Sequence, residues 1–254
     1  MAYSGDMVKK YDLSPLSIFR GFELLFIPLF VYGISIFPSA YLIGSYTQYY
    51  YRNYLFTHGW GWYLFFLSFL LIIAYLLLHI FLILFTGSAV RILRLGYKEG
   101  YHTPSIREKE TYKYALYYAL YRPTLQIINI FYIPPLFNLY MKLLGAKLGK
   151  NVMFGGRNLI ADPCMLEVGD DVLIGGGAEI LGHITEDKNF IKKTVIGDHC
   201  LVGGETLVFP GVVMEEGSVL AVRAFLPKNK TLKAWTIYGG VPAKEIGKVK
   251  IEDE

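Results

Sequence analysis

Over the last third of the chain, aliphatic side chains recur at every sixth position. Six consecutive positions of this period are apolar: Ile196, Val202, Val208, Met214, Leu220 and Leu226. The positions four residues after the first five are small or slim: Cys200, Thr206, Val212, Ser218 and Ala224. A helix repeats about every 3.6 residues and a strand every second residue, so this period fits neither element alone. Hexapeptide repeats are typical of a parallel β-helix, in which three hexads form one triangular coil, aliphatic side chains point inwards and small residues occupy the corners.

The same period continues upstream in shifted phase and is interrupted twice. Two further coils are marked by large apolar residues: Leu148, Phe154, Ile160, Val168, Ile174 and Ile180. Two extra residues enter the period near Asp162 and Pro163, and the step from the last aliphatic of this set to Ile196 is 16 residues. A loop is therefore expected to leave the coil around residues 185–189. The pattern predicts about four coils over residues 144–232, each stabilised by its neighbours.

Two long runs without acidic or basic side chains precede the repeat. The first, Leu24 to about Tyr46, is long enough to cross a bilayer, and a membrane helix tolerates its two prolines with a kink. The second, Trp62 to Val90, opens with aromatic residues, which are typical of a membrane interface. We expect a two-helix transmembrane hairpin over residues 24–90, joined by a short polar link at 48–61. The alternative is a pair of buried helices in a soluble protein.

Lysine and arginine are concentrated outside the two ends of the hairpin. Lys9, Lys10 and Arg20 come before it and Arg91, Arg94 and Lys98 follow it, whereas the link contains only Arg52. By the positive-inside bias, both ends and the β-helix face the cytoplasm, which predicts a multi-pass protein of the plasma membrane. Ser14 and Pro15 can start a helix within the N-terminal segment 1–23. Within the second run, His79 is expected to make a structural hydrogen bond to the first span or to another subunit, or else to contact a lipid-borne acceptor.

The segment 91–143 is expected to form helices next to the membrane. Residues 101–122 are rich in tyrosine and predict a helix whose aromatic face lies on the membrane or packs under the β-helix, ending at Arg122-Pro123. Residues 125–144 are apolar but interrupted, and we expect an interfacial or re-entrant element there. The C-terminal residues 233–254 are expected to contain a short helix at 243–247 and a charged tail.

Composition narrows the classes of function. The mean hydropathy of +0.37 and the aromatic content of 16% are high for an ordinary soluble enzyme. The net charge is only +4, and no dense basic run alternates with aromatics, so nucleic acid is not an expected partner. The two cysteines, Cys164 and Cys200, fall on corner positions two coils apart. At about 4.8 Å per coil their separation is about 9–10 Å, too far for a disulfide.

Several motifs together resemble the hexapeptide-repeat acyltransferases. These are the hexads, a loop that begins near His183, the Gly211-Val212-Val213 stretch and the segment Gly239–Lys244. The resemblance covers residues 144–247 and includes maltose, galactoside and polysaccharide O-acetyltransferases. It implies a left-handed parallel β-helix, a homotrimer and an acyl-CoA donor, most simply acetyl-CoA. The fold class expected is therefore α and β, with an N-terminal transmembrane helical hairpin and a C-terminal left-handed parallel β-helix of about four coils.

His183 is the best candidate for a catalytic base. It follows Leu181-Gly182, where the coil gives way to the inserted loop, and a neutral imidazole can take the proton of an attacking hydroxyl. In the family that this sequence resembles, a histidine at the start of such a loop has this role. Asp162 precedes it by 21 residues, about one coil plus the insertion, and could orient its ring from the next rung. The alternatives are that Asp162 only forms a turn, or that an acidic residue of the loop orients the ring.

The resemblance also implies the donor site. It places coenzyme A in a groove between neighbouring β-helices, where Gly203 and Ala221 admit the pantetheine arm and Arg223 and Lys244 meet phosphates. The alternative for the two small residues is that the hexad itself requires them. The fold is also known for a zinc carbonic anhydrase, but two histidines 16 residues apart do not make a three-histidine zinc site, so no metal is expected.

These observations favour a membrane-bound acyltransferase on the cytoplasmic side. The reaction expected is acetyl-CoA-dependent O-acetylation by direct, histidine-assisted transfer. A lipid-linked glycan or a lipid head group is the expected acceptor, because an anchor raises the effective concentration only of an acceptor confined to the bilayer. The alternative, from another class, is a non-catalytic β-helix that scaffolds a membrane complex.

Overall fold

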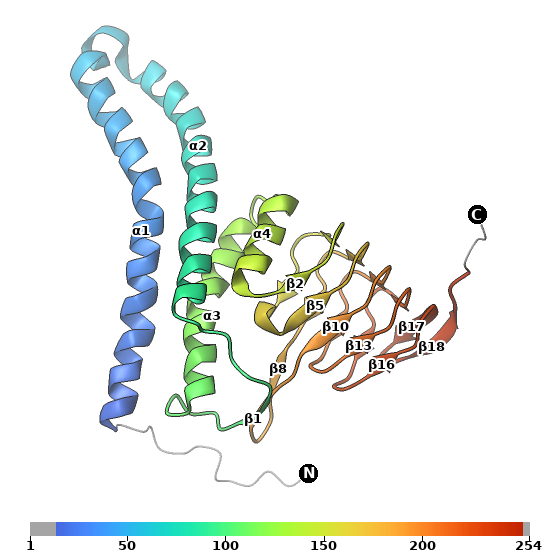
Figure 1. Ribbon diagram of the computed structural model, residues 1–254. Helices are drawn as coiled ribbons and strands as arrows, with labels where there is room; N and C mark the ends of the chain where they lie inside the picture. Colours follow the sequence, from blue (N-terminus) through green and yellow to red (C-terminus); the bar gives the residue numbers. More distant parts are fainter. Residues whose placement is uncertain (1–13, 251–254) are drawn as a thin grey trace.

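The computed structural model describes residues 14–250 and places a long helical hairpin beside a parallel β-helix (Figure 1). The hairpin consists of α1 (Pro15–Asn53) and α2 (Leu55–Ile92). As predicted, Ser14 caps α1, its side chain accepting a hydrogen bond from the Ser17 backbone. The polar link expected at 48–61 is wrong, because only Tyr54 separates the helices and a kink at Gly59, with φ 70°, lies inside α2. Lys9 and Lys10 lie outside the described residues.

The hairpin is long and apolar enough to cross a membrane, by length and composition. Only 17% and 22% of the most apolar windows of α1 and α2 are buried within the chain. Most of the apolar surface of the two helices is therefore exposed within this chain. Serine side chains face the contact between the helices, where Ser39 Oγ donates to the Ala74 carbonyl at 2.8 Å. His79 is buried in α2, with Nδ1 3.1 Å from the Tyr75 carbonyl of the same helix, so the described contact is not the predicted hydrogen bond to the first helix.

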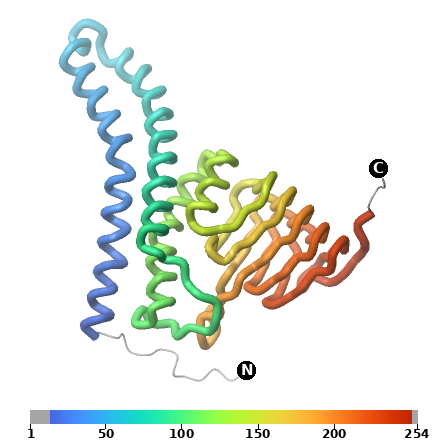
Figure 2. The backbone as a smooth tube through the Cα atoms, viewed as in Figure 1, coloured from blue at the N-terminus to red at the C-terminus, as the bar shows by residue number. Residues whose placement is uncertain are grey.

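Two shorter helices, α3 (Lys109–Ile128) and α4 (Pro134–Leu144), lie between the hairpin and the β-helix (Figures 1 and 2). The predicted break at Arg122-Pro123 is wrong, because α3 continues through Pro123. A proline leaves the carbonyl four residues earlier without its helical donor. That carbonyl belongs to Ala119. The Tyr32 hydroxyl of α1 lies 2.6 Å from the Leu120 carbonyl and 3.3 Å from that of Ala119, so a donor from the hairpin reaches this turn of α3.

The repeat folds as the hexads predict, into three parallel faces that meet at corners. The first face contains β2 (Lys147–Leu148), β5 (Leu166–Val168), β10 (Thr194–Ile196), β13 (Val213–Met214) and β16 (Thr231–Leu232). The second contains β3 (Met153–Phe154), β6 (Leu173–Ile174), β11 (Leu201–Val202), β14 (Val219–Leu220) and β17 (Thr236–Gly240). The third contains β4 (Leu159–Ile160), β7 (Glu179–Ile180), β12 (Leu207–Val208) and β15 (Phe225–Leu226). Four complete coils and the start of a fifth result, and their hexad aliphatics form a buried core.

The inserted segment is an ordered part of the sheet structure. β8 (His183–Thr185) and β9 (Asn189–Ile191) form an antiparallel hairpin where a loop was expected. A strand from the helical part, β1 (Gly100–His102), pairs with the other side of β9. Tyr101 of β1 packs on Phe190 of β9, with ring centroids 4.9 Å apart. The insertion therefore ties the β-helix to the segment that follows the hairpin.

Two local predictions are corrected at the ends of the repeat. The helix expected at 243–247 is instead β18 (Ala243–Lys248), which pairs antiparallel with β17. Pairing satisfies backbone groups that the last strand of the second face would otherwise leave open. Cys164 does not lie on a hexad corner but on the 3₁₀ turn η1 (Pro163–Met165), whereas Cys200 is buried at a corner. Both thiols are free.

Candidate active site

The two-residue insertion places the Asp162 carboxylate in the interior of the molecule. Asp162 is 1% exposed. Its Oδ2 accepts hydrogen bonds from the Gly182 backbone at 2.8 Å and from His183 Nδ1 at 2.7 Å. Its Oδ1 accepts one from the Tyr97 hydroxyl. A buried carboxylate with three donors is held in one orientation, as an ionised group in a low-dielectric interior requires.

The register of the third face explains why aspartate and histidine meet. Ile160 of β4 is paired with Ile180 of β7, so residues two and three positions later lie on adjacent rungs. Gly182 lies between the two functional side chains. A Cβ at Gly182 would come within 2.7 Å of the Asp162 Cβ, so only glycine allows this close approach. The structure thus brings His183 and Asp162 into the contact that the spacing predicted, whereas Glu186 of the insertion pairs with Lys228.

The surroundings of His183 define which ring nitrogen can accept a proton. The Nδ1 atom faces a carboxylate, which only accepts, so Nδ1 carries the hydrogen and Nε2 has a free lone pair. Burial alone lowers the pKa of His183, but the hydrogen bond and the charge of Asp162 outweigh it and raise the pKa above its ordinary value of 6.5. The side chain is 20% exposed. The arrangement is that of a general base whose basicity is increased by a buried anion.

A cluster of tyrosines from the helical part surrounds this pair. The Tyr114 hydroxyl of α3 lies 3.0 Å from His183 Nε2, and the two rings are 4.7 Å apart. Tyr117 is fully buried, and its hydroxyl accepts a hydrogen bond from the Cys164 backbone at 3.2 Å. Sequence reasoning left open whether this aromatic face lies on the membrane or packs under the β-helix, and it packs against the site. The i, i+3, i+7 spacing of Tyr114, Tyr117 and Tyr121 is the signal that could have identified it.

The residues predicted for the donor lie at a different corner. Gly203, Ala221 and Arg223 lie in the turns between the second and third faces, which we call the second corner, whereas His183 follows the third face. A Cβ at Gly203 would lie 2.5 Å from the Val222 backbone nitrogen, so coil packing by itself requires glycine there. Within one chain, the structure does not bring these residues together with His183.

The two predicted cations of the donor site are both on the surface. The Arg223 side chain is 75% exposed and forms an ion pair with Glu205, Nε to Oε2, at 2.6 Å. Lys244 lies on β18 in register with Gly239 of β17, and it is exposed. Both side chains are therefore accessible to a ligand or to a neighbouring molecule.

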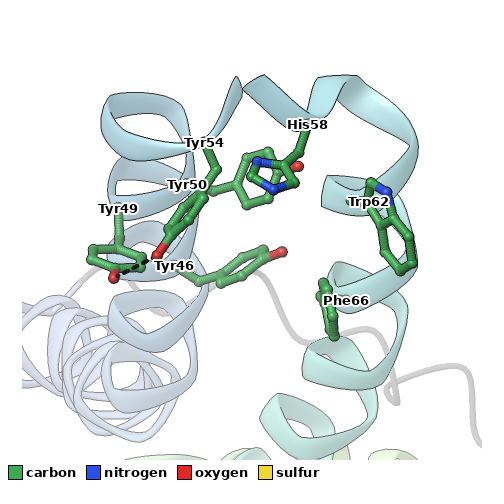
Figure 3. A pocket seen from close by; sticks show the side chains of 7 residues that line it. All are labelled: Tyr46, Tyr49, Tyr50, Tyr54, His58, Trp62 and Phe66. Carbon is green, nitrogen blue, oxygen red and sulfur yellow. Dashed lines mark hydrogen bonds between the residues drawn. The ribbon is translucent and has the colours of Figure 1, made fainter. Parts of the chain in front are cut away.

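Among the residues that the structure describes, two hollows stand out, and His183 lines neither of them. One, of about 380 Å³, lies along the second corner and is lined by Asn129, Ile130, Tyr132, Gly155, Gly156, Arg157, Gly176, Gly177 and Glu205. The other, of about 410 Å³, lies at the tip of the hairpin, where Tyr46, Tyr49, Tyr50, Tyr54, His58, Trp62 and Phe66 line it (Figure 3). Within residues 14–250, no group of three histidine, cysteine, aspartate or glutamate side chains could hold a metal ion.

Comparison with known proteins gives partial matches to acyltransferases. No protein-family model matches the chain. The chain is 32% identical over 113 residues to YvoF of Bacillus subtilis (strain 168), which is named as an acetyltransferase, covering 42% of this chain and 63% of that protein. It is 39% identical over 61 residues to a chloramphenicol acetyltransferase of Escherichia coli, covering 24% and 28% of the two chains. The chain thus spans less than two thirds of either relative.

One solved structure is also similar to this chain in part. A hexapeptide-repeat-containing acetyltransferase from Vibrio cholerae superposes with a TM-score of 0.42 at 18% identity, covering 50% of this chain and 87% of that one. The names of the relatives agree with the family that the motifs indicate. By sequence, the chain is similar over part of its length to acetyltransferases, as its residues predict.

Proposed function

We propose that this protein is an acyltransferase that moves an acetyl group from acetyl-CoA to a hydroxyl group. The observation that carries the proposal is the buried Asp162–His183 pair at 2.7 Å, which leaves Nε2 as a proton acceptor at the start of the insertion. The acceptor oxygen attacks the thioester carbonyl while His183 receives its proton, and the same proton then returns to the departing thiolate. Transfer is direct. Burial, with a contribution from the Asp162 charge, raises the pKa of the Cys164 thiol to about 12, so this cysteine is not a thiolate nucleophile at neutral pH.

The donor is proposed to bind between neighbouring copies, in a trimer with three sites. An outward ladder of apolar side chains on the second face supports this: Met153, Leu173, Leu201, Val219 and Ile237, in register on adjacent strands. The first three are 60%, 40% and 37% exposed, so the chain alone leaves much of the ladder open. A second copy on this face would bring its own His183 towards the second corner, where the predicted donor residues lie. A stable monomer with full activity in native mass spectrometry would contradict the trimer.

The acceptor is proposed to be held in a membrane, as a lipid-linked glycan or a lipid head group. The hairpin exposes apolar side chains over most of its length, and β1 and α3, which follow it, contact the insertion and His183. The proposed location is the plasma membrane, with the β-helix on the cytoplasmic side, where acetyl-CoA is available. Confinement of enzyme and acceptor to one bilayer raises their effective concentration.

The test uses the purified full chain in detergent, radiolabelled acetyl-CoA and a membrane lipid extract. We expect label to be transferred to a lipid or lipid-linked fraction by the native protein and not by the His183→Ala variant. Absence of both transfer and coenzyme A binding would instead support a scaffold without catalytic function.

A further inference from the structure

Both ring nitrogens of His183 are already occupied by groups of the chain itself. Nδ1 is bonded to Asp162, and Nε2 lies 3.0 Å from the Tyr114 hydroxyl. Because Nε2 has a lone pair and no hydrogen, the phenol is the donor in this contact. An acceptor hydroxyl therefore does not meet a vacant imidazole nitrogen. It meets the oxygen of Tyr114, which the described residues leave with no other hydrogen-bond partner.

The ring of Tyr114 is fixed in this place by its surroundings. It lies on the body of α3, within the second turn and well away from both ends. Its centroid is 4.7 Å from that of His183, 5.6 Å from that of Tyr97 and 5.9 Å from that of Tyr118. Moving the phenol away from Nε2 would disrupt three ring contacts as well as the hydrogen bond. The geometry thus favours a hydroxyl that stays during the reaction over one that leaves to admit the acceptor.

We propose that Tyr114 is a further catalytic residue, which relays the acceptor's proton to His183. This inference rests on the proposed function. As the acceptor oxygen forms its bond to the thioester carbonyl carbon, its proton passes to the Tyr114 oxygen, and the Tyr114 proton passes to His183 Nε2. When the carbon–sulfur bond breaks, His183 Nε2 returns its proton to the Tyr114 oxygen and Tyr114 gives its own proton to the departing sulfur, so the thiolate becomes the thiol of coenzyme A. No net charge remains on the phenol at any stage, and Tyr114 is regenerated.

The environment of the phenol suits such a relay. Burial, the Asp162 charge and the neighbouring Tyr118 raise the pKa of Tyr114 above its ordinary value, so the hydroxyl keeps its proton and can donate it at neutral pH. A concerted shift requires no free phenolate, which this environment would disfavour. The relay also gives α3 a part in catalysis, since the reacting acceptor must approach on the side of this helix. The helical part of the chain then completes the site.

The first experiment measures steady-state kinetics of the full chain in detergent, with acetyl-CoA and either water or a membrane lipid extract as acceptor. Tyr114→Phe keeps the ring contacts and removes only the hydroxyl. We expect its kcat to fall about 10- to 100-fold, with the KM for acetyl-CoA unchanged, as for loss of a proton-transfer group. Tyr112→Phe is the matched control, because Tyr112 lies on the same helix but its hydroxyl donates to Glu23 at 2.7 Å, and its kcat should remain within about twofold of the native value.

The second experiment measures the pKa of His183 by NMR of the histidine-labelled full chain, which requires no substrate. A phenol that donates to Nε2 stabilises the neutral imidazole, so Tyr114→Phe is expected to raise this pKa by about 0.5–1 unit. The acidic limb of the rate profile should move to higher pH by the same amount. A residue that only supports packing would change the yield of folded protein without moving either value.

The possible outcomes separate the relay from the proposed function. If Tyr114→Phe reacts as fast as the native protein or faster while His183→Ala is inactive, the phenol merely occupies the acceptor's place and the relay is wrong. An unchanged His183 pKa in the Phe variant also overturns it. If His183→Ala remains fully active, the base assignment fails and the relay fails with it.

Discussion

Two corners of the same β-helix differ in whether the six-residue period is interrupted. At the corner after the third face, the period is broken by two residues after β4 and by the insertion after β7. There the chain buries the Asp162 carboxylate and holds a partly buried histidine against it, with a tyrosine of α3 in contact with that histidine. At the second corner, the period is kept from coil to coil, and Gly203 is required by the Val222 backbone 2.5 Å from its hypothetical Cβ. The packing of the hexads does not require the residues that interrupt the repeat. In this chain those residues form the candidate site.

The comparison also separates two kinds of inference. Asp162 and His183 are identified by mutual geometry, which a coil has no reason to provide. Gly203 and Ala221 are small residues at positions where the packing of each coil requires small residues. Their presence alone therefore does not indicate a ligand. A test of the comparison therefore substitutes residues at both corners. Activity is measured for the Asp162 and His183 variants, and stability for the Gly203 variant.

The largest effect is expected from His183→Asn. Removal of the base should lower the rate of acetyl transfer about 10²- to 10⁴-fold, with little change in melting temperature. His199→Asn is the matched control, because His199 lies on a regular corner with φ 57° and its side chain is 50% exposed. Transfer rates by radiolabel and melting curves of both variants make the measurement. Equal losses in the two variants would show that the broken corner has no special role.

A somewhat smaller loss is expected from Asp162→Asn. Because Asp162 raises the pKa of His183 above 6.5, and a base works only in its neutral form, the native rate should fall as pH drops through that raised pKa. Without the carboxylate charge the pKa falls, so the acidic limb moves to lower pH while the maximal rate drops about 10- to 10³-fold. A full pH–rate profile tests both statements. A limb that stays in place would mean that Asp162 does not set the basicity of His183.

The sequence predicted the coils, the two interruptions and the Asp162–His183 contact, because a six-residue period converts sequence separation directly into spatial register. The sequence predicted local structure less well where contacts with distant parts of the chain determine it. Pro123 stays within α3, and the turn before it contacts Tyr32, 91 residues earlier in the chain, whose hydroxyl reaches the Ala119 and Leu120 carbonyls. Residues 243–247 become a strand because β17 offers them an open edge. The contact between Tyr114 and His183 joins residues of different periodicity, 69 positions apart, which no single pattern relates.

At the second corner, Gly203→Ala is expected to act on stability. The added Cβ would meet the backbone of the next coil, including the Leu220 carbonyl oxygen at 2.7 Å, which a flexible side chain cannot relieve. We expect a loss of about 1–3 kcal/mol, or about 3–10 °C in melting temperature, with activity per folded molecule retained. Gly247→Ala is the control, because its nearest neighbour would be a side-chain atom 3.9 Å away. A melting temperature unchanged by Gly203→Ala would remove the packing explanation.

The smallest effect is expected from Arg223→Gln. This variant tests most directly whether the second corner binds the donor. Its ion pair with Glu205 is exposed and should contribute little to stability, so the melting temperature should stay the same. If this corner meets the phosphates of the donor, the KM for acetyl-CoA should rise about three- to tenfold while kcat is unchanged. Lys147→Gln is the matched control, since Lys147 is equally exposed at 75% and paired with Glu167 at 2.7 Å, but on the first face. Because both variants lose one paired surface cation, a rise in KM confined to Arg223→Gln would assign the donor to the second corner. Identical KM values in both variants would mean that the residues of the second corner serve packing and do not bind the donor.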